Sequence, residues 1–301
     1  MAGLWFRCIH ILNTNVVSRY QNSTPPPSTS SWVDDWETRE SLKYLRNPAP
    51  LISKYAYAGV TPEYSRAFAW NHSYRFFRAR WNDLAEAGID DPLYLQASAE
   101  LVAYLASFGM YGVHTHLMTV NKTVFVPILH SLVAHARDLH VTCGRGSYSA
   151  TDVQELIDRV RNALRAINAE ANLQLAVTDT LISKILHGTL ACMPAFDSHV
   201  RSGISIFNRL SPDILSLTSS TALPTDLERS LAPLYDWACR QDVQAELQRI
   251  GATFAPFVDS DGKVLPYPTM RIVDQVFWAL GSHMDKLRAE ASHIQVSSSE
   301  R

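Results

Sequence analysis

Apolar residues recur along this chain with the three-to-four-residue spacing of α-helices, and proline and glycine divide them into segments. The clearest pattern covers residues 153–167. Thr151 and Gln154, at its beginning, form a predicted capping box. A similar apolar face covers residues 272–287, in the last predicted helix. The apolar positions of the first pattern are Val153, Leu156, Ile157, Val160, Leu164 and Ile167.

Start and stop signals predict two helices in the first half of the chain. Thr61-Pro62-Glu63 has an N-cap residue, a proline at the first helical position and an acid in the first turn. Gly88 is a natural end for that helix. Asp91-Pro92 repeats the start signal, and the helix after it is predicted to run to about Ser107.

The second half of the chain carries similar signals. A helix is predicted from residue 181 to 191, before Pro194, and another begins near Phe196. Thr225 and Glu228 form a second capping box ahead of a leucine-rich stretch.

The overall pattern is that of a mainly α protein. Apolar and polar residues alternate too briefly for a large sheet, and only a small hairpin is predicted around residues 257–266. The chain has no internal repeat of the length that solenoids use. We therefore predict a single large multi-helix domain over residues 34–290, with a frayed tail over residues 291–301.

Residues 1–33 differ from the rest of the chain. They contain no acidic residue and are rich in Ser, Thr, Asn and Pro. Such a segment buries too little apolar area to offset its chain entropy, which predicts a disordered arm. Arginine and serine without acidic residues are also the composition of a mitochondrial transit peptide, which remains an alternative.

The composition excludes several classes of protein. Hydrophobic residues make up 47% and charged residues 19%, and the formal net charge is -2, so no bulk positive charge is present to hold nucleic acid. The four cysteines are far apart and form no CxxC pair, which is typical of a reducing compartment. Residues 101–121 are long enough to cross a bilayer, but their glycines and histidines favour a buried segment broken by a turn. We expect an intracellular protein without a membrane span, cytoplasmic or nuclear, with mitochondria as an alternative.

Aromatic and basic residues interleave between residues 64 and 81. Bases stack on aromatic rings and phosphates pair with arginine, so Arg75, Arg78 and Arg80 are candidate contacts to DNA or RNA. The alternative is that the aromatic residues form one face of a helix and pack in the core, with the arginines on its solvated flank. The residues of this aromatic stripe are Trp70, Tyr74, Phe77 and Trp81.

Histidine spacing gives only a weak metal-binding pattern. His114 and His116 are able to present two ligands from an extended segment. His130, His135 and His140 are five residues apart, so they drift around a helix and do not share a face. The chain has no HExxH, Walker A or GxSxG motif. We therefore predict no metal and no cofactor, and leave the His114–His116 pair open.

The segment from Lys184 to Asp197 is the strongest candidate for a catalytic site. A helix carries Lys184, and a proline turn delivers Asp197 to the start of the next helix, where a carboxylate caps backbone N–H groups. Its chemical role would be to stabilise a cationic transition state or to activate water. Lys184 is a candidate nucleophile if desolvated, and otherwise a surface or capping lysine. If Asp197 only caps the helix, Asp197→Asn should cost little stability, because asparagine caps equally well.

Three segments together, residues 104–111, 184–197 and 267–281, resemble a family of uncharacterised bacterial and fungal proteins. The resemblance covers about residues 95–281 and implies no established activity. Members of that family tend to carry Arg-Gly-Ser-Ser after Gly-Met-Tyr, where this chain has Gly112-Val113-His114-Thr115. The arginine of that motif therefore has no counterpart here.

A shorter stretch, Pro194-Ala-Phe-Asp197-Ser-His199-Val200, is similar to the segment that carries the catalytic aspartate in helix-hairpin-helix DNA glycosylases. In that family the aspartate promotes base release, and some members use a hairpin lysine as nucleophile. The resemblance implies that Asp197 is catalytic. Lys184 is closer to the aspartate than the family lysine, and the glycine-rich hairpin of the family is absent.

These observations lead to three hypotheses. The first is a helical protein that binds nucleic acid and excises a base, with Asp197 and Lys184 as catalytic residues and Arg75, Arg78, Arg80 and His199 as binding residues. The second is a non-catalytic helical interaction or regulatory protein. The third is a small-molecule enzyme with a pocket between helices, which a buried, pKa-shifted group among Asp197, His199 and His187 would indicate. Whether the protein is an enzyme is left open.

Overall fold

The computed structural model describes residues 66–111, 117–138, 149–210, 227–259 and 261–299, together with Ser41, Tyr44 and Ile52. Within these ranges the chain is mainly helical, which confirms the predicted fold class. Several predicted features lie outside them: the arm over residues 1–33, the helix start at residues 61–63, the His114–His116 pair, His140 and Thr225. No helix in the described ranges is both long and apolar enough to cross a membrane.

Nine α-helices are described in these ranges, together with two 3-10 turns and one small hairpin. The strands pair antiparallel, with Phe257 opposite Leu265, which confirms the predicted hairpin. The α-helices are α4 (Arg66–Glu86), α5 (Pro92–Ser107), α6 (Val126–Asp138), α7 (Ala150–Glu170), α8 (Asp179–Thr189), α9 (Ser198–Leu210), α11 (Leu227–Ala238), α12 (Gln241–Gly251) and α13 (Thr269–Ser299). The 3-10 turns are η2 (Leu117–Thr119) and η3 (Lys122–Phe125), and the strands are β1 (Phe257–Val258) and β2 (Val264–Leu265).

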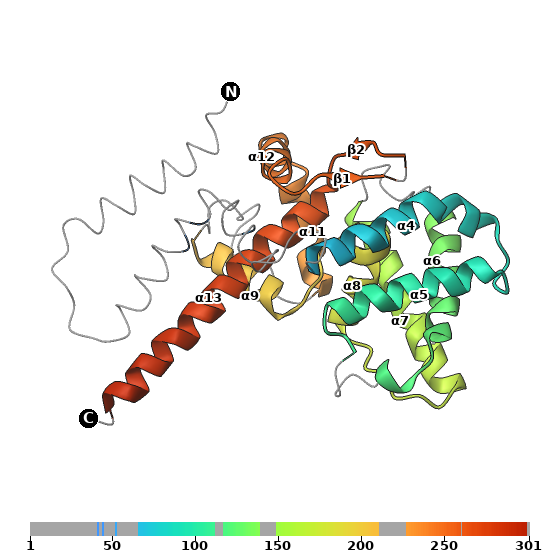
Figure 1. The fold of residues 1–301 in the computed structure, drawn as a ribbon, viewed down its shortest axis with the longest axis horizontal. Coiled ribbons are helices and arrows are strands. Elements are labelled where there is room, and N and C mark those ends of the chain that lie inside the picture. The colour runs from blue at the N-terminus through green and yellow to red at the C-terminus, as the bar shows by residue number, and fades with distance from the viewer. Residues whose placement is uncertain are drawn as a thin grey trace.

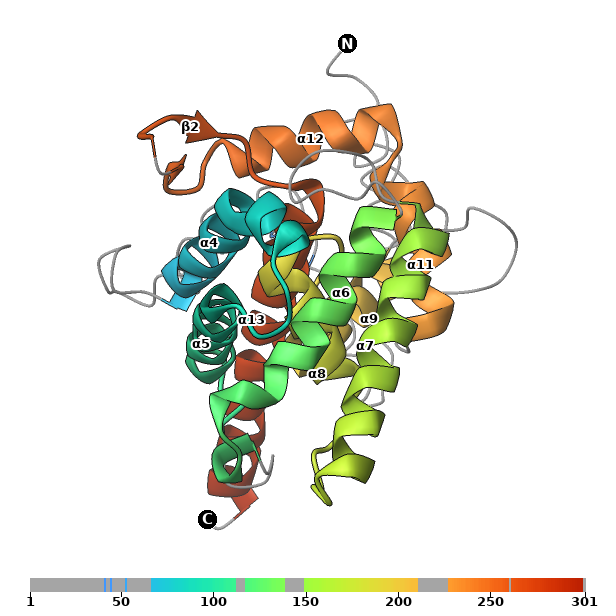
Figure 2. The ribbon, with the colours of Figure 1, turned by 90° about the vertical axis from the view of Figure 1, so that its right-hand side faces the viewer.

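Helix α8 lies in the interior of the helical body. It contacts α4, α5 and α7, and every residue from Leu181 to Thr189 is buried. Helices α6 and α7 pack side by side, while the long α13 packs along α9 and extends away from the body at its C-terminal end (Figures 1 and 2). From Leu181 onward, the side chains of α8 are therefore enclosed by other parts of the protein.

The aromatic stripe of α4 belongs to the core. Trp70, Tyr74, Phe77 and Trp81 are all buried, which confirms the core-packing alternative. Two side chains of α4 also form hydrogen bonds to the backbone at the end of α8. The Trp70 indole N–H donates to the carbonyl oxygen of His187 at 2.9 Å, and the Ser73 hydroxyl donates to that of Gly188 at 3.1 Å.

Two helix starts test the predicted capping signals. Asp91 caps α5 as predicted, because its side chain accepts the Leu93 N–H at 2.8 Å. The predicted box at Thr151 is wrong. The cap of α7 is Ser149, whose hydroxyl accepts the Asp152 N–H while Asp152 accepts the Ser149 N–H. Ser149 has the extended backbone that an N-cap requires, whereas Thr151 already lies inside the helix. The predicted apolar face of α7 is buried from Val153 to Leu164.

Helices α9 and α13 approach each other backbone to backbone. A Cβ atom on Gly281 would overlap the carbonyl oxygen of His199, and one on Gly203 would overlap that of Phe277. Only glycine permits such a crossing, since every other residue carries a Cβ atom. The close approach fixes the start of α9, and Asp197 directly precedes it.

Candidate active site

The segments around residues 104–111, 184–197 and 267–281 meet in the interior of the protein. The ring of Tyr104 fills the space beside Gly188, and the ring of Phe108 lies 4.9 Å from the Lys184 ammonium. Where these segments meet, five ionisable side chains form what we call the polar cluster: Lys184, His187, Asp197, Arg271 and Asp274. Buried charges are costly, so a group of them inside an apolar core marks a candidate functional site.

Lys184 and Asp197 form the first ion pair of the cluster. The lysine Nζ donates to the aspartate Oδ2 at 3.3 Å, and the two side chains are 4% and 17% exposed. The face of the Phe108 ring also contacts the ammonium, a favourable cation–π geometry. The interpretation of Lys184 as a surface or capping residue is therefore wrong, because α8 is covered on all sides.

Asp197 uses its two carboxylate oxygens for different partners. Oδ1 accepts the backbone N–H of Val200 at 3.0 Å, which is the bond of a helix N-cap. Oδ2 accepts the bond from Lys184. The carboxylate is therefore fixed at the positive end of α9 and keeps a partly exposed edge.

Side chains from three other helices bind the backbone of the turn that precedes Asp197. Asp274 of α13 accepts the Ala195 N–H at 2.9 Å, and Tyr235 of α11 donates to the Cys192 carbonyl. Three side chains of α8 bind the same turn. Around Phe196, the Ser183 hydroxyl accepts the N–H at 2.8 Å and the Thr180 hydroxyl donates to the carbonyl at 2.9 Å. His187 Nδ1 contacts the Met193 carbonyl at 2.8 Å. A turn held at so many points positions its last residue rigidly.

The same turn contains a strained residue. Ala191 has a φ of +50°, a conformation that costs a residue with a Cβ atom about 1 kcal/mol or more. It persists because the surrounding bonds over-determine the path of the chain. Backbone strain of this kind concentrates at functional sites, which adds to the case for Asp197.

Arg271 and Asp274 form the second ion pair, one turn apart on α13. The arginine Nη1 donates to the aspartate Oδ2 at 3.0 Å, and both residues are buried. The guanidinium lies 4.5 Å from the centre of the Trp70 ring. Burial on its own would raise the pKa of Asp274, but the charge that His187 carries at low pH, the charge of Arg271 and the bonds from Ala195 and Gln275 hold that pKa below its usual value.

His187 contacts both members of the second ion pair and is itself neutral. Its Nδ1 carries the proton, because the Met193 carbonyl 2.8 Å away only accepts. Nε2 then accepts from Arg271 Nη1 at 3.3 Å. Burial, followed by the nearby Arg271 and Lys184 charges, lowers the pKa of His187 to about 4, although Asp274 and the Met193 bond oppose this. At neutral pH the contact between His187 and Asp274 is therefore not an ion pair.

The depressed pKa of His187 predicts a pH-dependent stability. In the unfolded chain a histidine protonates near pH 6.5, whereas folded His187 protonates only near pH 4, so the unfolded state binds more protons between these values. The contribution of His187 is complete above pH 6.5 and is lost as the pH falls to 4, by about 3 kcal/mol in all. Urea denaturation at several pH values in this window measures the slope. The variant His187→Gln, which does not titrate, should remove most of it, and an equal slope in both proteins would contradict this assignment.

Two buried polar atoms beside the cluster have no hydrogen-bond partner among the described residues: the Tyr104 hydroxyl and Arg271 Nε. Burial raises the pKa of Tyr104 far above its usual value. The negative charges of Asp274 and Asp197 raise it further, whereas the positive charge of Arg271 lowers it. Sequence reasoning missed Tyr104, Arg271 and Asp274. One signal was available for the last two, since they interrupt the start of an otherwise apolar helix.

The structure places the three predicted arginines away from this pair and His199 close to it along the chain. Arg75 and Arg78 are half-buried and Arg80 is exposed, all on α4. Arg75 bonds to His72 and Arg80 to Asp83 within that helix. His199 lies two residues after Asp197, and its ring bonds to Asp285 of α13.

The fold and the site define an all-α protein with a pre-organised lysine–aspartate pair. Comparison with protein families, curated proteins and solved structures finds no match for this chain. No group of three or more His, Cys, Asp and Glu residues in the described ranges is arranged to hold a metal ion.

Proposed function

We propose that this protein is an enzyme that releases a base from DNA or RNA, with Asp197 as the catalytic carboxylate. The observation that carries the proposal is the placement of Asp197. It is held through one oxygen by the start of α9 and through the other by Lys184, yet its side chain is 17% exposed. The similarity of residues 194–200 to the aspartate segment of helix-hairpin-helix glycosylases agrees with this role.

The chemistry suits a fixed carboxylate. When the bond between base and sugar breaks, its electron pair leaves with the base and positive charge develops on the sugar. A carboxylate already in place stabilises that charge without having to reorganise. Water then adds to the sugar carbon and loses a proton.

Lys184 serves as a positioning residue in this proposal. A lysine nucleophile must be a neutral amine that is free to reach the substrate. Lys184 is 4% exposed and donates its hydrogen bond to Asp197. Its contribution is to hold the Asp197 carboxylate in one orientation.

A small-molecule enzyme is the second candidate, and His187 favours it. That histidine is buried and has a lowered pKa, which is typical of active sites between helices. A purely structural Asp197 in an interaction protein is the third, because the bond to Val200 is that of an ordinary helix cap. In that case no substrate would be converted.

The test is an assay of base release by the purified full chain. Substrates are single- and double-stranded DNA and RNA, lesion-bearing duplexes and free nucleosides, each at low and high salt. The test variant is Lys184→Met/Asp197→Asn, which removes the carboxylate without leaving a buried unpaired ammonium. The matched control is Asp179→Asn, which removes a half-exposed carboxylate that pairs with Arg161 and Arg201.

We expect wild type and Asp179→Asn to release the base and the double variant to be inactive while folded. Turnover of nucleosides alone would favour the small-molecule enzyme. A folded wild-type protein that neither binds nucleic acid at low salt nor converts any substrate would refute the proposal.

A further inference from the structure

His199 and Asp285 form a second histidine–carboxylate pair where α9 meets α13. His199 Nδ1 lies 2.9 Å from Asp285 Oδ2. The other oxygen of Asp285 accepts from the Ser202 hydroxyl at 3.0 Å and from Arg288 Nη1 at 3.5 Å. Asp285 is therefore fixed from both helices, and it fixes the imidazole in turn.

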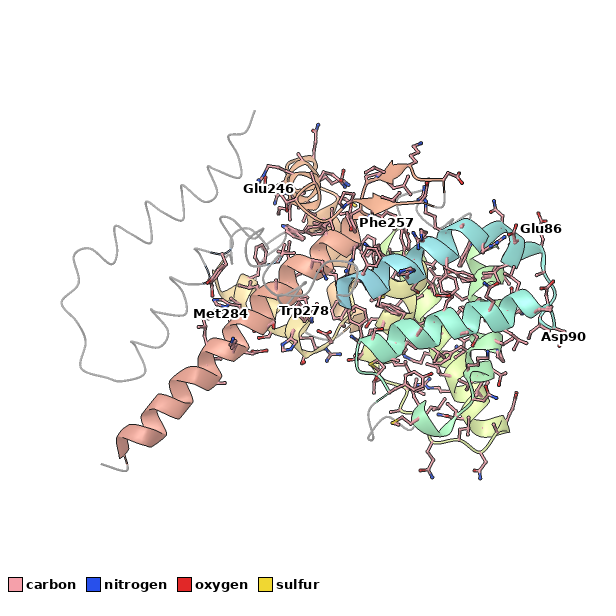
Figure 3. All side chains as sticks on the ribbon, in the orientation of Figure 1. Glu86, Asp90, Glu246, Phe257, Trp278 and Met284 are labelled. Carbon is pink, nitrogen blue, oxygen red and sulfur yellow. The ribbon has the colours of Figure 1, made fainter. Side chains whose placement is uncertain are left out.

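The hydrogen bond determines which nitrogen of His199 is reactive. A carboxylate only accepts, so Nδ1 carries the proton and the lone pair of the neutral ring is on Nε2. The ring is 39% exposed and meets the ring of Trp278 edge-on, with centroids 5.7 Å apart. Figure 3 marks Trp278 on the part of α13 that crosses α9. An accessible histidine held by a carboxylate is the arrangement of a general base.

His199 and Asp197 occupy the same end of α9. Asp197 directly precedes the helix, and His199 is its second residue. Asp285 binds His199 directly, and Arg288 of α13 binds Asp285. The nearest charged residues along the chain are Asp197, before α9, and Arg201, whose guanidinium contacts the Phe196 carbonyl and Asp179. The start of α9 therefore carries a fixed carboxylate bonded to α8 and, two residues later, an oriented imidazole bonded to α13.

We propose that His199, oriented by Asp285, is the general base that activates the attacking water at this site. The inference rests on the proposed function. A proton of the water passes to His199 Nε2 as the oxygen bonds to the sugar carbon, and the bond from that carbon to the base breaks with its electron pair on the base. The protonated His199 then returns the proton to the departing base or to solvent. Asp197 stabilises the positive charge on the sugar throughout.

The test compares His199→Asn with wild type in the base-release assay. Asparagine places its amide nitrogen near the position of Nδ1, so the bond to Asp285 is retained while Nε2 is lost. The matched control is His135→Gln, since His135 also pairs with a carboxylate on another helix, Glu155, but through Nε2 at 3.0 Å, the position that a glutamine amide reaches. A third variant, Asp285→Asn, keeps the shape of the partner and removes its charge.

We expect His199→Asn to lower kcat by about 100-fold or more and to remove the acid limb of the rate against pH. Asp285→Asn should lower kcat by about tenfold or more, and His135→Gln should match wild type. Wild-type kcat and pH profile in His199→Asn, together with an inactive Lys184→Met/Asp197→Asn, would overturn this inference alone. Wild-type rates in both would overturn the proposed function, and this inference with it.

Discussion

Replacing Asp197 with asparagine is expected to lower the free energy of unfolding by about 3 kcal/mol. Asparagine still caps α9, so the loss does not come from the helix. It comes from Lys184, whose buried ammonium loses the only charged partner within ion-pair distance among the described residues. Removing one partner of a buried ion pair leaves an uncompensated charge, which costs more than the pair itself contributes.

Lys184→Met and the double variant Lys184→Met/Asp197→Asn complete a double-mutant cycle with Asp197→Asn, and both should lose less stability. Lys184→Met is expected to cost only about 1 kcal/mol, because Asp197 retains the Val200 N–H and a partly exposed edge. Lys184→Met/Asp197→Asn should return to within about 1 kcal/mol of wild type, since no charge is stranded. Urea denaturation followed by circular dichroism gives all four values. An Asp197→Asn protein as stable as wild type would show that Lys184 does not depend on Asp197.

Gly281→Ala is expected to destabilise the protein by about 3 kcal/mol. The added methyl group would overlap the His199 carbonyl and approach the Gly203 N–H, both of which are backbone atoms of α9. A backbone has no rotamer with which to avoid the overlap, so α9 and α13 must move apart. Separating them also disturbs His199 and Asp197 at the start of α9, and we expect base release to fall together with stability.

Gly88→Ala is the matched control for this substitution. A Cβ atom at Gly88 meets nothing within 4 Å, and its backbone is not in the left-handed region. Its effect should be within about 0.5 kcal/mol of zero. Thermal and urea denaturation of the two alanine variants beside wild type measure the difference. Equal stability of the two variants would contradict the close approach of α9 and α13.

Local sequence patterns were sufficient for several of the helices, such as α5, α7 and α8, but not for α6 or for the division between α11 and α12. The 3.6-residue period of α7 and the aromatic stripe of α4 placed their buried faces correctly, because amphipathic spacing is a property of each helix alone. The cap of α7 shows the limit of this reasoning. Two overlapping polar patterns competed within six residues, and only the backbone conformation at Ser149 selected between them.

The candidate site was predictable only in part. Asp197 follows a proline turn and precedes a helix, so its position at a helix start could be inferred from local signals. Lys184 could not be placed, because a lysine among apolar residues is equally consistent with a solvated edge. Arg271 and Asp274 lie 74 and 77 residues beyond Asp197, and no local pattern connects them with it.

The sequence by itself therefore determined the fold class, the buried helix faces and the placement of Asp197 at the start of a helix. Tertiary structure decided that residues 181–189 of α8 are enclosed, that Lys184 pairs with Asp197, and that Asp274 and His187, both bonded to Arg271, bind the turn before Asp197. The physical reason is the range of the interactions. Periodicity and capping act over one or two turns of chain, whereas the burial of a charge depends on segments far apart in sequence that only the folded core brings together.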